Sequence, residues 1–212
     1  FFLADNGVHY TAVGPLDAAA TAHHMMAAEW LFRIGFVSFI LAALFFLLAA
    51  WALYVVLKPV NKDLALLFVL LNLGGVAIWC SILFSEFAAL LLLSGADYLN
   101  EFQADQLGAL AVLFLNLYQN GFMIAQLFLN LWLFPLGYLV LKSSFLPRVL
   151  GILLIIDGFA MLIWFFQFFF FPGYEVISSI SLAVSFIAEG SLCLWLLIKG
   201  VKDQKLALSV DR

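Results

Sequence analysis

Five long apolar runs constrain what this sequence can fold into. They cover about residues 32–57, 64–92, 107–141, 149–171 and 178–198. As helices, all five are long enough to cross a hydrocarbon layer, which takes about 20 residues. Of the 212 residues, 67% are hydrophobic and 10% are charged, whereas soluble domains have about 25% charged residues. The sequence therefore predicts an all-α membrane protein, a polytopic bundle of transmembrane helices with five spans in this chain.

The segments outside the bundle (residues 32–198) are short. Residues 1–31 are predicted to form an extracytoplasmic segment with an interfacial helix over residues 18–29, which Asp17 can cap. Residues 199–212 are predicted to form a cytoplasmic tail. The third run would reach about 52 Å as a straight helix, more than the roughly 30 Å of a hydrocarbon core. We expect a kink at Pro135, because proline removes a helical hydrogen bond.

The basic residues are segregated along the chain. With five spans, eight of the nine fall on one side of the membrane, and Arg33 is the exception. Seven acidic residues share the side of Arg33. Basic segments stay in the cytoplasm, so we predict a protein of the inner (cytoplasmic) membrane with a cytoplasmic C-terminus. The eight residues are Lys58, Lys62, Lys142, Arg148, Lys199, Lys202, Lys205 and Arg212.

Five amides interrupt the third apolar run. At about 100° per residue they fall within an arc of roughly 120° on one helix. Amides in hydrocarbon are unfavourable without partners, so this face is expected to turn toward other helices or a watery cavity. The amides then either hold helices together or line a path for a ligand or an ion. They are Asn116, Gln119, Asn120, Gln126 and Asn130.

Three acids lie inside the apolar runs. Glu86 is near the outer end of its run, and Arg33 opens the neighbouring run on the same side, which predicts an Arg33–Glu86 ion pair. Asn72 shares the helix face of Glu86. Asp157 and Glu189 lie deeper, where no basic residue is available, so burial favours their neutral acids.

A neutral acid can donate a hydrogen bond to an amide such as Gln126 or Asn130. It can also exchange protons with water and couple protonation to transport. The predicted intramembrane polar network consists of Asn72, Glu86, Asn116, Gln119, Asn120, Gln126, Asn130, Asp157 and Glu189.

Metal and catalytic motifs are weak in this sequence. His23 and His24 precede two methionines, but neighbouring residues point about 100° apart on a helix, so convergence on a copper ion is unfavourable. There is no GxSxG, HExxH, Walker or GxGxxG motif. We therefore predict no metal site, catalytic residue or cofactor. The sequence also has no basic cluster of the kind that binds nucleic acid.

Four stretches carry a family resemblance: DAAATAHHMMAAEWLFRIG, LLLSGADYL, LKSSFLPRVLGILL and AEGSLCLWLLIKGVK. With the spacing of the runs, they resemble a widespread family of small bacterial multi-pass membrane proteins described only as a domain of unknown function. The resemblance implies a fold and a topology but no chemistry. Members usually have one more span before the DAAAT-like segment, which implies six spans in the complete protein. Members often carry histidine where this chain has Tyr118 and Trp132, so a histidine-dependent role is not carried over.

Two function hypotheses follow. The first is a non-enzymatic accessory or structural subunit of a membrane complex, or a binder of an apolar ligand. Its partners would be membrane lipids, other membrane protein subunits and an apolar small molecule. The alternative is a small proton-coupled transporter that uses Asp157 and Glu189.

Overall fold

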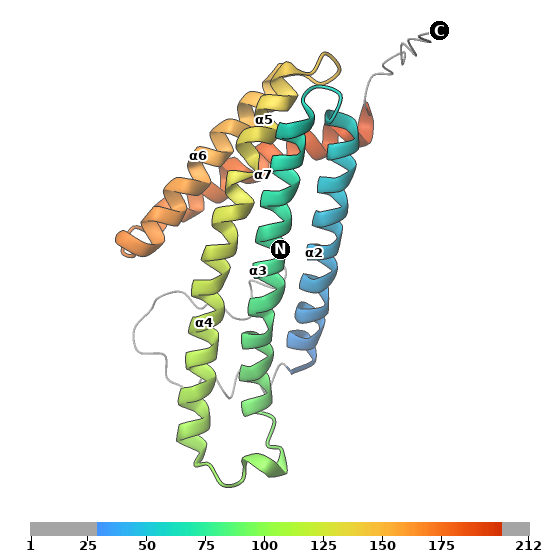
Figure 1. Cartoon of the computed structure of the whole chain (residues 1–212). Coiled ribbons are helices and arrows are strands. Elements are labelled where there is room, and N and C mark those ends of the chain that lie inside the picture. Colours follow the sequence, from blue (N-terminus) through green and yellow to red (C-terminus); the bar gives the residue numbers. More distant parts are fainter. Residues whose placement is uncertain (1–28, 201–212) are drawn as a thin grey trace. The chain divides into compact units, whose positions relative to one another are not determined.

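The computed structural model describes residues 29–200, and this part of the chain is helical. The predicted interfacial helix and both candidate metal ligands, His23 and His24, lie outside the described residues, as does most of the predicted tail. The helices are α2 (Glu29–Leu57), α3 (Lys62–Leu92), the short 3-10 helix η1 (Asp97–Leu99), α4 (Ala104–Leu131), α5 (Leu133–Lys142), α6 (Arg148–Phe170) and α7 (Glu175–Ile198) (Figure 1).

Five helical stretches are long and apolar enough to cross a membrane, which confirms the predicted fold class. Their ends differ from the predicted ones by three residues at most. The stretches are Arg33–Leu57, Lys62–Leu92, Ala104–Lys142, Arg148–Phe170 and Val176–Ile198.

Polar side chains and glycines set several helix ends. The Asn61 side-chain oxygen accepts a hydrogen bond from the Leu64 amide at 3.0 Å, which caps the start of α3. At the start of α4, the Gln106 side chain accepts from the Gln103 amide at 3.2 Å. Gly95 follows α3 with a φ of 68°, a left-handed conformation that favours glycine at a helix end. These local signals explain why the predicted ends were close to the observed ones.

The third span is interrupted where proline predicts it. Helix α4 ends at Leu131 and α5 begins at Leu133, so the break falls at Trp132. Pro135 has no amide hydrogen, so it cannot donate to the Leu131 carbonyl four residues earlier. The hydrogen bonds from Trp132 to Phe128 (3.3 Å) and from Leu136 to Trp132 (3.2 Å) continue on either side of this gap.

The chain divides into two compact units. The first contains the residues up to Leu48 and Gly75–Ala125, hence the larger part of each of α2, α3 and α4. Its apolar core includes Ala89, Ala111 and Leu115. The Trp79 ring, which is buried, lies edge-on to both Phe39 and Phe122, at centroid distances of 6.1 and 5.9 Å. Apolar and aromatic packing therefore connects the three helices of this unit.

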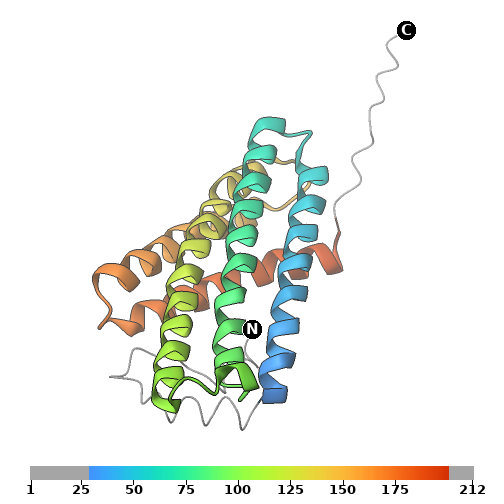
Figure 2. The same ribbon diagram turned by 60° about the horizontal axis from the view of Figure 1, so that its bottom comes forward.

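The second unit contains Ala49–Gly74 and the residues from Gln126 on, which include α5, α6 and α7. Helices α5 and α6 run side by side, and α6 and α7 form an antiparallel hairpin (Figures 1 and 2). Glycines bring α5 and α6 unusually close. A Cβ on Gly151 would lie 2.7 Å from the Gly137 carbonyl oxygen and 2.8 Å from the Leu141 amide nitrogen.

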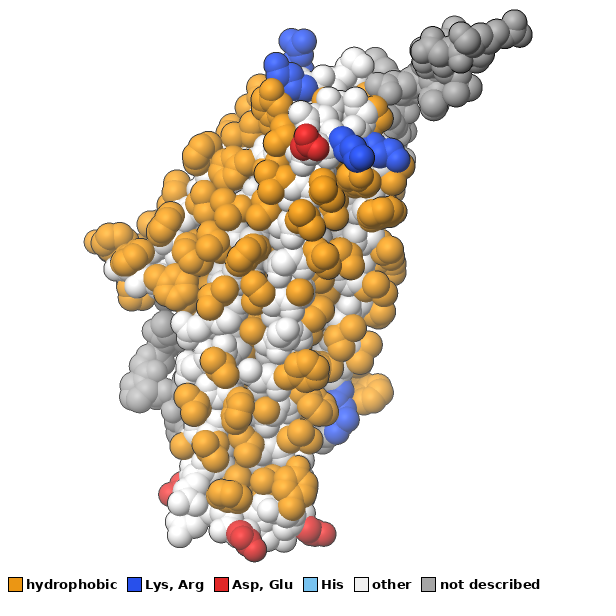
Figure 3. All heavy atoms as spheres, viewed as in Figure 1, with side chains coloured by type: hydrophobic (Ala, Val, Ile, Leu, Met, Phe, Trp, Pro, Cys, Tyr) orange, Lys and Arg blue, Asp and Glu red, His pale blue; other side chains and the backbone are white. Residues whose placement is uncertain are grey.

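The outer surface of the helices is largely apolar. Figure 3 shows hydrophobic side chains spread over the visible helices, with the charged side chains gathered at helix ends. Helix α6 illustrates the pattern: between residues 149 and 166, its exposed side chains are all aliphatic or aromatic. This is the composition expected of a face in contact with lipid tails.

We predict that Gly151→Ala lowers the thermal stability of the detergent-solubilised protein by about 1–3 kcal/mol, because the added methyl group meets backbone that cannot move aside. Gly190→Ala on α7 is the control, since a Cβ there meets nothing within 4 Å. Thermal unfolding of the two variants in one detergent measures the difference. Equal melting temperatures would contradict the close α5–α6 packing.

Candidate functional site

The most deeply placed acid of the described chain lies between α6 and α7. Asp157 is on α6 and is completely buried. Its Oδ2 accepts a hydrogen bond from the Ser185 hydroxyl on α7 at 3.3 Å. Its Oδ1 is also buried and has no hydrogen-bond partner within the described residues. Half of the hydrogen-bonding capacity of this carboxyl is therefore unused at the centre of an apolar hairpin.

A second hydroxyl crosses the same helix pair one turn away. Ser181 donates to the Ala160 carbonyl of α6 at 2.8 Å, and both Ser181 and Ser185 are buried. Small residues four positions apart let two helix backbones approach closely. The two serines therefore fix the register of α7 against α6, and that register brings Ser185 to Asp157.

Glu189 is the next residue on this face of α7. It follows Ser185 by four residues, a spacing that places two side chains on the same side of a helix. Glu189 is half-buried and lies close enough to Asp157 for the two carboxyl groups to influence each other. The structure thus brings together the two acids that the sequence singled out. We call Asp157, Ser181, Ser185 and Glu189 the α6–α7 acid site.

Two buried amides belong to the same unit. Asn72 on α3 is fully buried, and neither its oxygen nor its nitrogen has a hydrogen-bond partner in the described chain. Asn130 on α4 is buried too, and its side-chain nitrogen is likewise without a partner there. Gln126, one turn earlier, is half-buried.

The helix register places these amides at a similar depth to the acid. Phe68 of α3 contacts Trp132 at a centroid distance of 6.1 Å, so Asn72 and Asn130 lie at about the same level of the antiparallel α3–α4 pair. Phe134 contacts Phe159 at 5.0 Å, which places Asp157 near the level of Pro135. Pro135 is five residues beyond Asn130, or about 7 Å along a helix. The second unit therefore holds a layer of buried polar groups whose hydrogen-bonding capacity is incompletely used.

The amides of the first unit are arranged differently. Asn116 and Asn120 are exposed, and each side-chain nitrogen donates to a carbonyl of its own helix, Val112 at 3.0 Å and Asn116 at 2.8 Å respectively. Gln119 is half-buried. The structure does not bring the five amides into one interior cluster, because Ala111 and Leu115 occupy the inward face of α4 in this unit. One network that joins all nine predicted polar residues stays a prediction.

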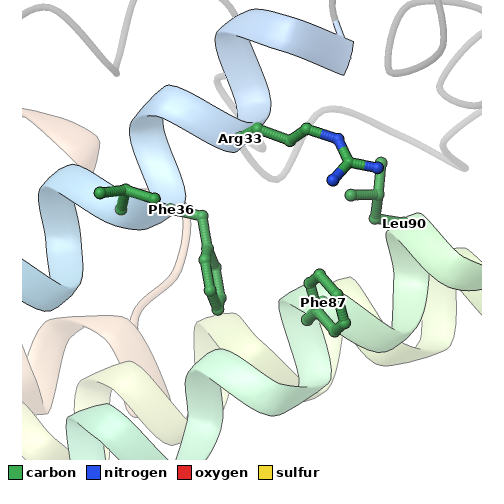
Figure 4. A pocket seen from close by; sticks show the side chains of 5 residues that line it. Arg33, Phe36, Phe87 and Leu90 are labelled. Atoms are coloured by element: carbon green, nitrogen blue, oxygen red, sulfur yellow. The ribbon is translucent and has the colours of Figure 1, made fainter.

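Arg33 lines a surface recess of about 120 Å³ between α2 and α3, together with Phe36, Val37, Phe87 and Leu90. Figure 4 shows the guanidinium extended along the rim near Leu90, with the rings of Phe36 and Phe87 beside it. The rings of Phe36 and Phe87 are 5.5 Å apart. A cation above apolar walls suits the boundary between headgroups and acyl chains.

Glu86 lies one residue before this recess. Its buried Oε2 has no hydrogen-bond partner in the described chain, so the ion pair with Arg33 stays a prediction. The charge of Glu86 interacts with the phenol of Tyr118 on α4. Tyr118 was not among the predicted site residues. The antiparallel pairing of α3 and α4, which brings Tyr118 near Glu86, would have indicated it.

The geometry defines the class of this protein: it is a multi-pass helical membrane protein with acids and amides buried among its helices. The family model described as Domain of unknown function (DUF4386) matches residues 1–200, and the chain belongs to that family. Neither the curated proteins nor the solved structures contain a match to this chain.

We predict that Ser185→Ala lowers the stability of the folded protein by about 0.5–1.5 kcal/mol, because Asp157 then loses the donor to its Oδ2. Ser179→Ala is the control, since Ser179 is exposed on the same helix. Unfolding in detergent with increasing dodecyl sulfate measures both. The Asp157→Leu variant, which removes both carboxyl oxygens, completes a double-mutant cycle, and additive effects in that cycle would contradict the hydrogen bond.

Proposed function

We propose that this protein is a small proton-coupled transporter, with Asp157 and Glu189 as its proton-binding pair. The observation that carries the proposal is the buried carboxyl of Asp157, which has one oxygen bonded to Ser185 and the other without a partner within residues 29–200. Ionisable side chains inside a membrane span are costly and usually serve ion or proton pathways. We therefore assign the proton to Asp157, whose carboxyl is incompletely hydrogen-bonded within residues 29–200.

The chemistry of the pair favours an exchangeable proton. A charged carboxylate at the centre of a membrane costs at least about 2.5 kcal/mol, and a second one nearby adds repulsion. A protonated Asp157 can accept from Ser185 at one oxygen, and the O–H at its other oxygen is then available to a water molecule or a solute. Glu189 lies one turn beyond Ser185 on the same face of α7. The proton of Asp157 therefore has a second acceptor nearby.

The acid pair also suggests a class of solute. No Lys, Arg or His occurs between Arg148 and Lys199 in the sequence, so both acids lie in a stretch without a basic partner. Carboxylates and hydroxyls in such a setting suit a small cation or a protonated amine. The acid pair would then bind either a proton or the cationic solute, so the site would carry one added positive charge at every step of the exchange.

The accessory-subunit hypothesis gains less from the structure. Its motivation was that the buried amides and acids could satisfy one another. Oδ1 of Asp157, Oε2 of Glu86 and both amide atoms of Asn72 have no partners within residues 29–200. These groups fit a site that exchanges its ligands better than they fit permanent helix-to-helix bonds.

We predict that Asp157→Asn abolishes, and Glu189→Gln lowers at least tenfold, the proton movement driven by a solute gradient. Each variant keeps the side-chain shape but can no longer take up or release the proton. The wild-type protein is reconstituted in vesicles that contain a pH-sensitive dye. Gradients of monovalent cations and small alkylamines are then applied one at a time.

Ser179→Ala serves as the matched control on α7 and should retain wild-type flux. A pH change should produce a carbonyl band of a protonated carboxyl in the infrared difference spectrum of the wild-type protein, and this band should be missing in Asp157→Asn. A merely structural Asp157 would not change its protonation with pH and would give no such band. Wild-type flux in both acid variants, or no response of the wild-type protein to any solute in the panel, would refute the proposal.

A further inference from the structure

The exposed face of α4 differs from the exposed face of α6 in its polar side chains. Between residues 109 and 124, every exposed position of α4 falls within an arc of about 100° on the helix. Two amides, Asn116 and Asn120, occupy this face among apolar neighbours. We call it the α4 stripe, and it consists of Ala109, Leu113, Asn116, Leu117, Asn120 and Ile124.

Helix α6 provides the comparison for a face that suits lipid. Its exposed residues over a similar length contain no polar side chain: they are Val149, Ile152, Ile156, Phe159, Ile163 and Phe166. The α4 stripe spans an arc of about the same width but carries an amide on two successive turns. An amide facing acyl chains is unfavourable, so the composition of the stripe fits contact with protein rather than with lipid.

The position of Asn120 along the helix supports this reading. A Cβ on the adjacent Gly121 would lie 2.5 Å from the Ile82 side chain of α3, which shows that the two helices are close here. Ile82 precedes Leu90 by eight residues, about 12 Å along α3. Leu90 lines the recess of Arg33, so Asn120 lies well inside the level of that cation. Headgroup water does not account for an exposed amide at this depth.

The amides use only part of their hydrogen-bonding capacity within α4. Each side-chain nitrogen donates one hydrogen to its own backbone, which leaves a second N–H and the carbonyl oxygen facing outward. An amide with one free donor and one free acceptor is complementary to an identical amide. A two-fold axis along the membrane normal would bring the α4 stripes of two copies together with like residues opposed.

From this geometry we propose that the α4 stripe is a homodimer interface. The partner is a second copy of this chain, and the contact is reciprocal hydrogen bonding of Asn116 and Asn120 between packed Leu113, Leu117 and Ile124. Asparagine side chains bond across transmembrane helices in this manner. The proposal concerns the first unit and does not depend on the proton-binding pair.

Disulfide trapping in native membranes tests the interface. The native cysteines, Cys80 and Cys193, are first replaced by serine in the full chain. Leu117→Cys is then compared with Ile156→Cys, whose positions are 54% and 49% exposed on α4 and α6 respectively. Mild oxidation should give a covalent homodimer for Leu117→Cys and none for Ile156→Cys.

Self-association in vesicles provides a second measurement that needs no new cysteine. The double variant Asn116→Leu/Asn120→Leu should weaken dimerisation by roughly tenfold, measured by energy transfer between labelled copies. The Asn116→Gln/Asn120→Gln variant keeps the amides and should lose less. The proposal would be overturned by a cross-link to a different protein, by equal dimer yields at both cysteine positions, or by unchanged energy transfer in the leucine variant.

Discussion

A polar group at hydrocarbon depth has no water to bond with, and this constraint organises the structure described above. Helices satisfy their backbones internally, so only side chains and helix breaks need partners from elsewhere. The chain meets the need in three ways. Asn116 and Asn120 donate hydrogen bonds to carbonyls of their own helix. Ser181 donates to a backbone carbonyl of α6, and Asp157 accepts a hydrogen bond from the Ser185 hydroxyl of α7. Only the last of these leaves a carboxyl oxygen unsatisfied.

The difference between the two units follows from what their helices bury. In the first unit, apolar residues such as Ala111 and Leu115 fill the inner face of α4, and its amides are displaced to the outside. In the second unit, α6 and α7 bury Asp157 and two serines, and they partly bury Glu189. One helix, α4, thus contributes Asn116 to the surface and Asn130 to the interior. Chemistry is therefore expected of the second unit and association of the first.

Much of the fold could be read from the sequence, because hydrophobic length and local capping signals depend on neighbours along the chain. Pro135 marked a break that the structure contains, and Asn61 and Gly95 lie just outside the observed ends of α3. The direction of the amide arc could not be predicted in this way. Helical periodicity gives the angles between side chains, but the packing of other helices decides whether an angle points inward. Asn116 and Asn130 have the same chemistry and opposite burial for that reason.

The site was predictable in its members and not in its contacts. Asp157 and Glu189 were conspicuous as acids in apolar runs, since no basic residue shares their stretch. The bond between Ser185 and Asp157 depends on the register of α7 against α6, which the turn after Phe170 and the Ser181 bond set together. The charge interaction of Tyr118 with Glu86 depends in the same way on the register of α4 against α3. Register is a property of two segments, and one sequence read along its length does not contain it explicitly.

The close approach at Gly137 and Gly151 limits how this protein can vary over evolutionary time. Each glycine leaves room for the backbone of the other helix, so neither position can accept a side chain unless the two helices separate. A relative with larger residues at both positions would have to rebuild the hairpin from α5 to α6, and the depth of its Asp157 counterpart would change with it. Ancestry that preserves the acid is thus expected to preserve the paired glycines.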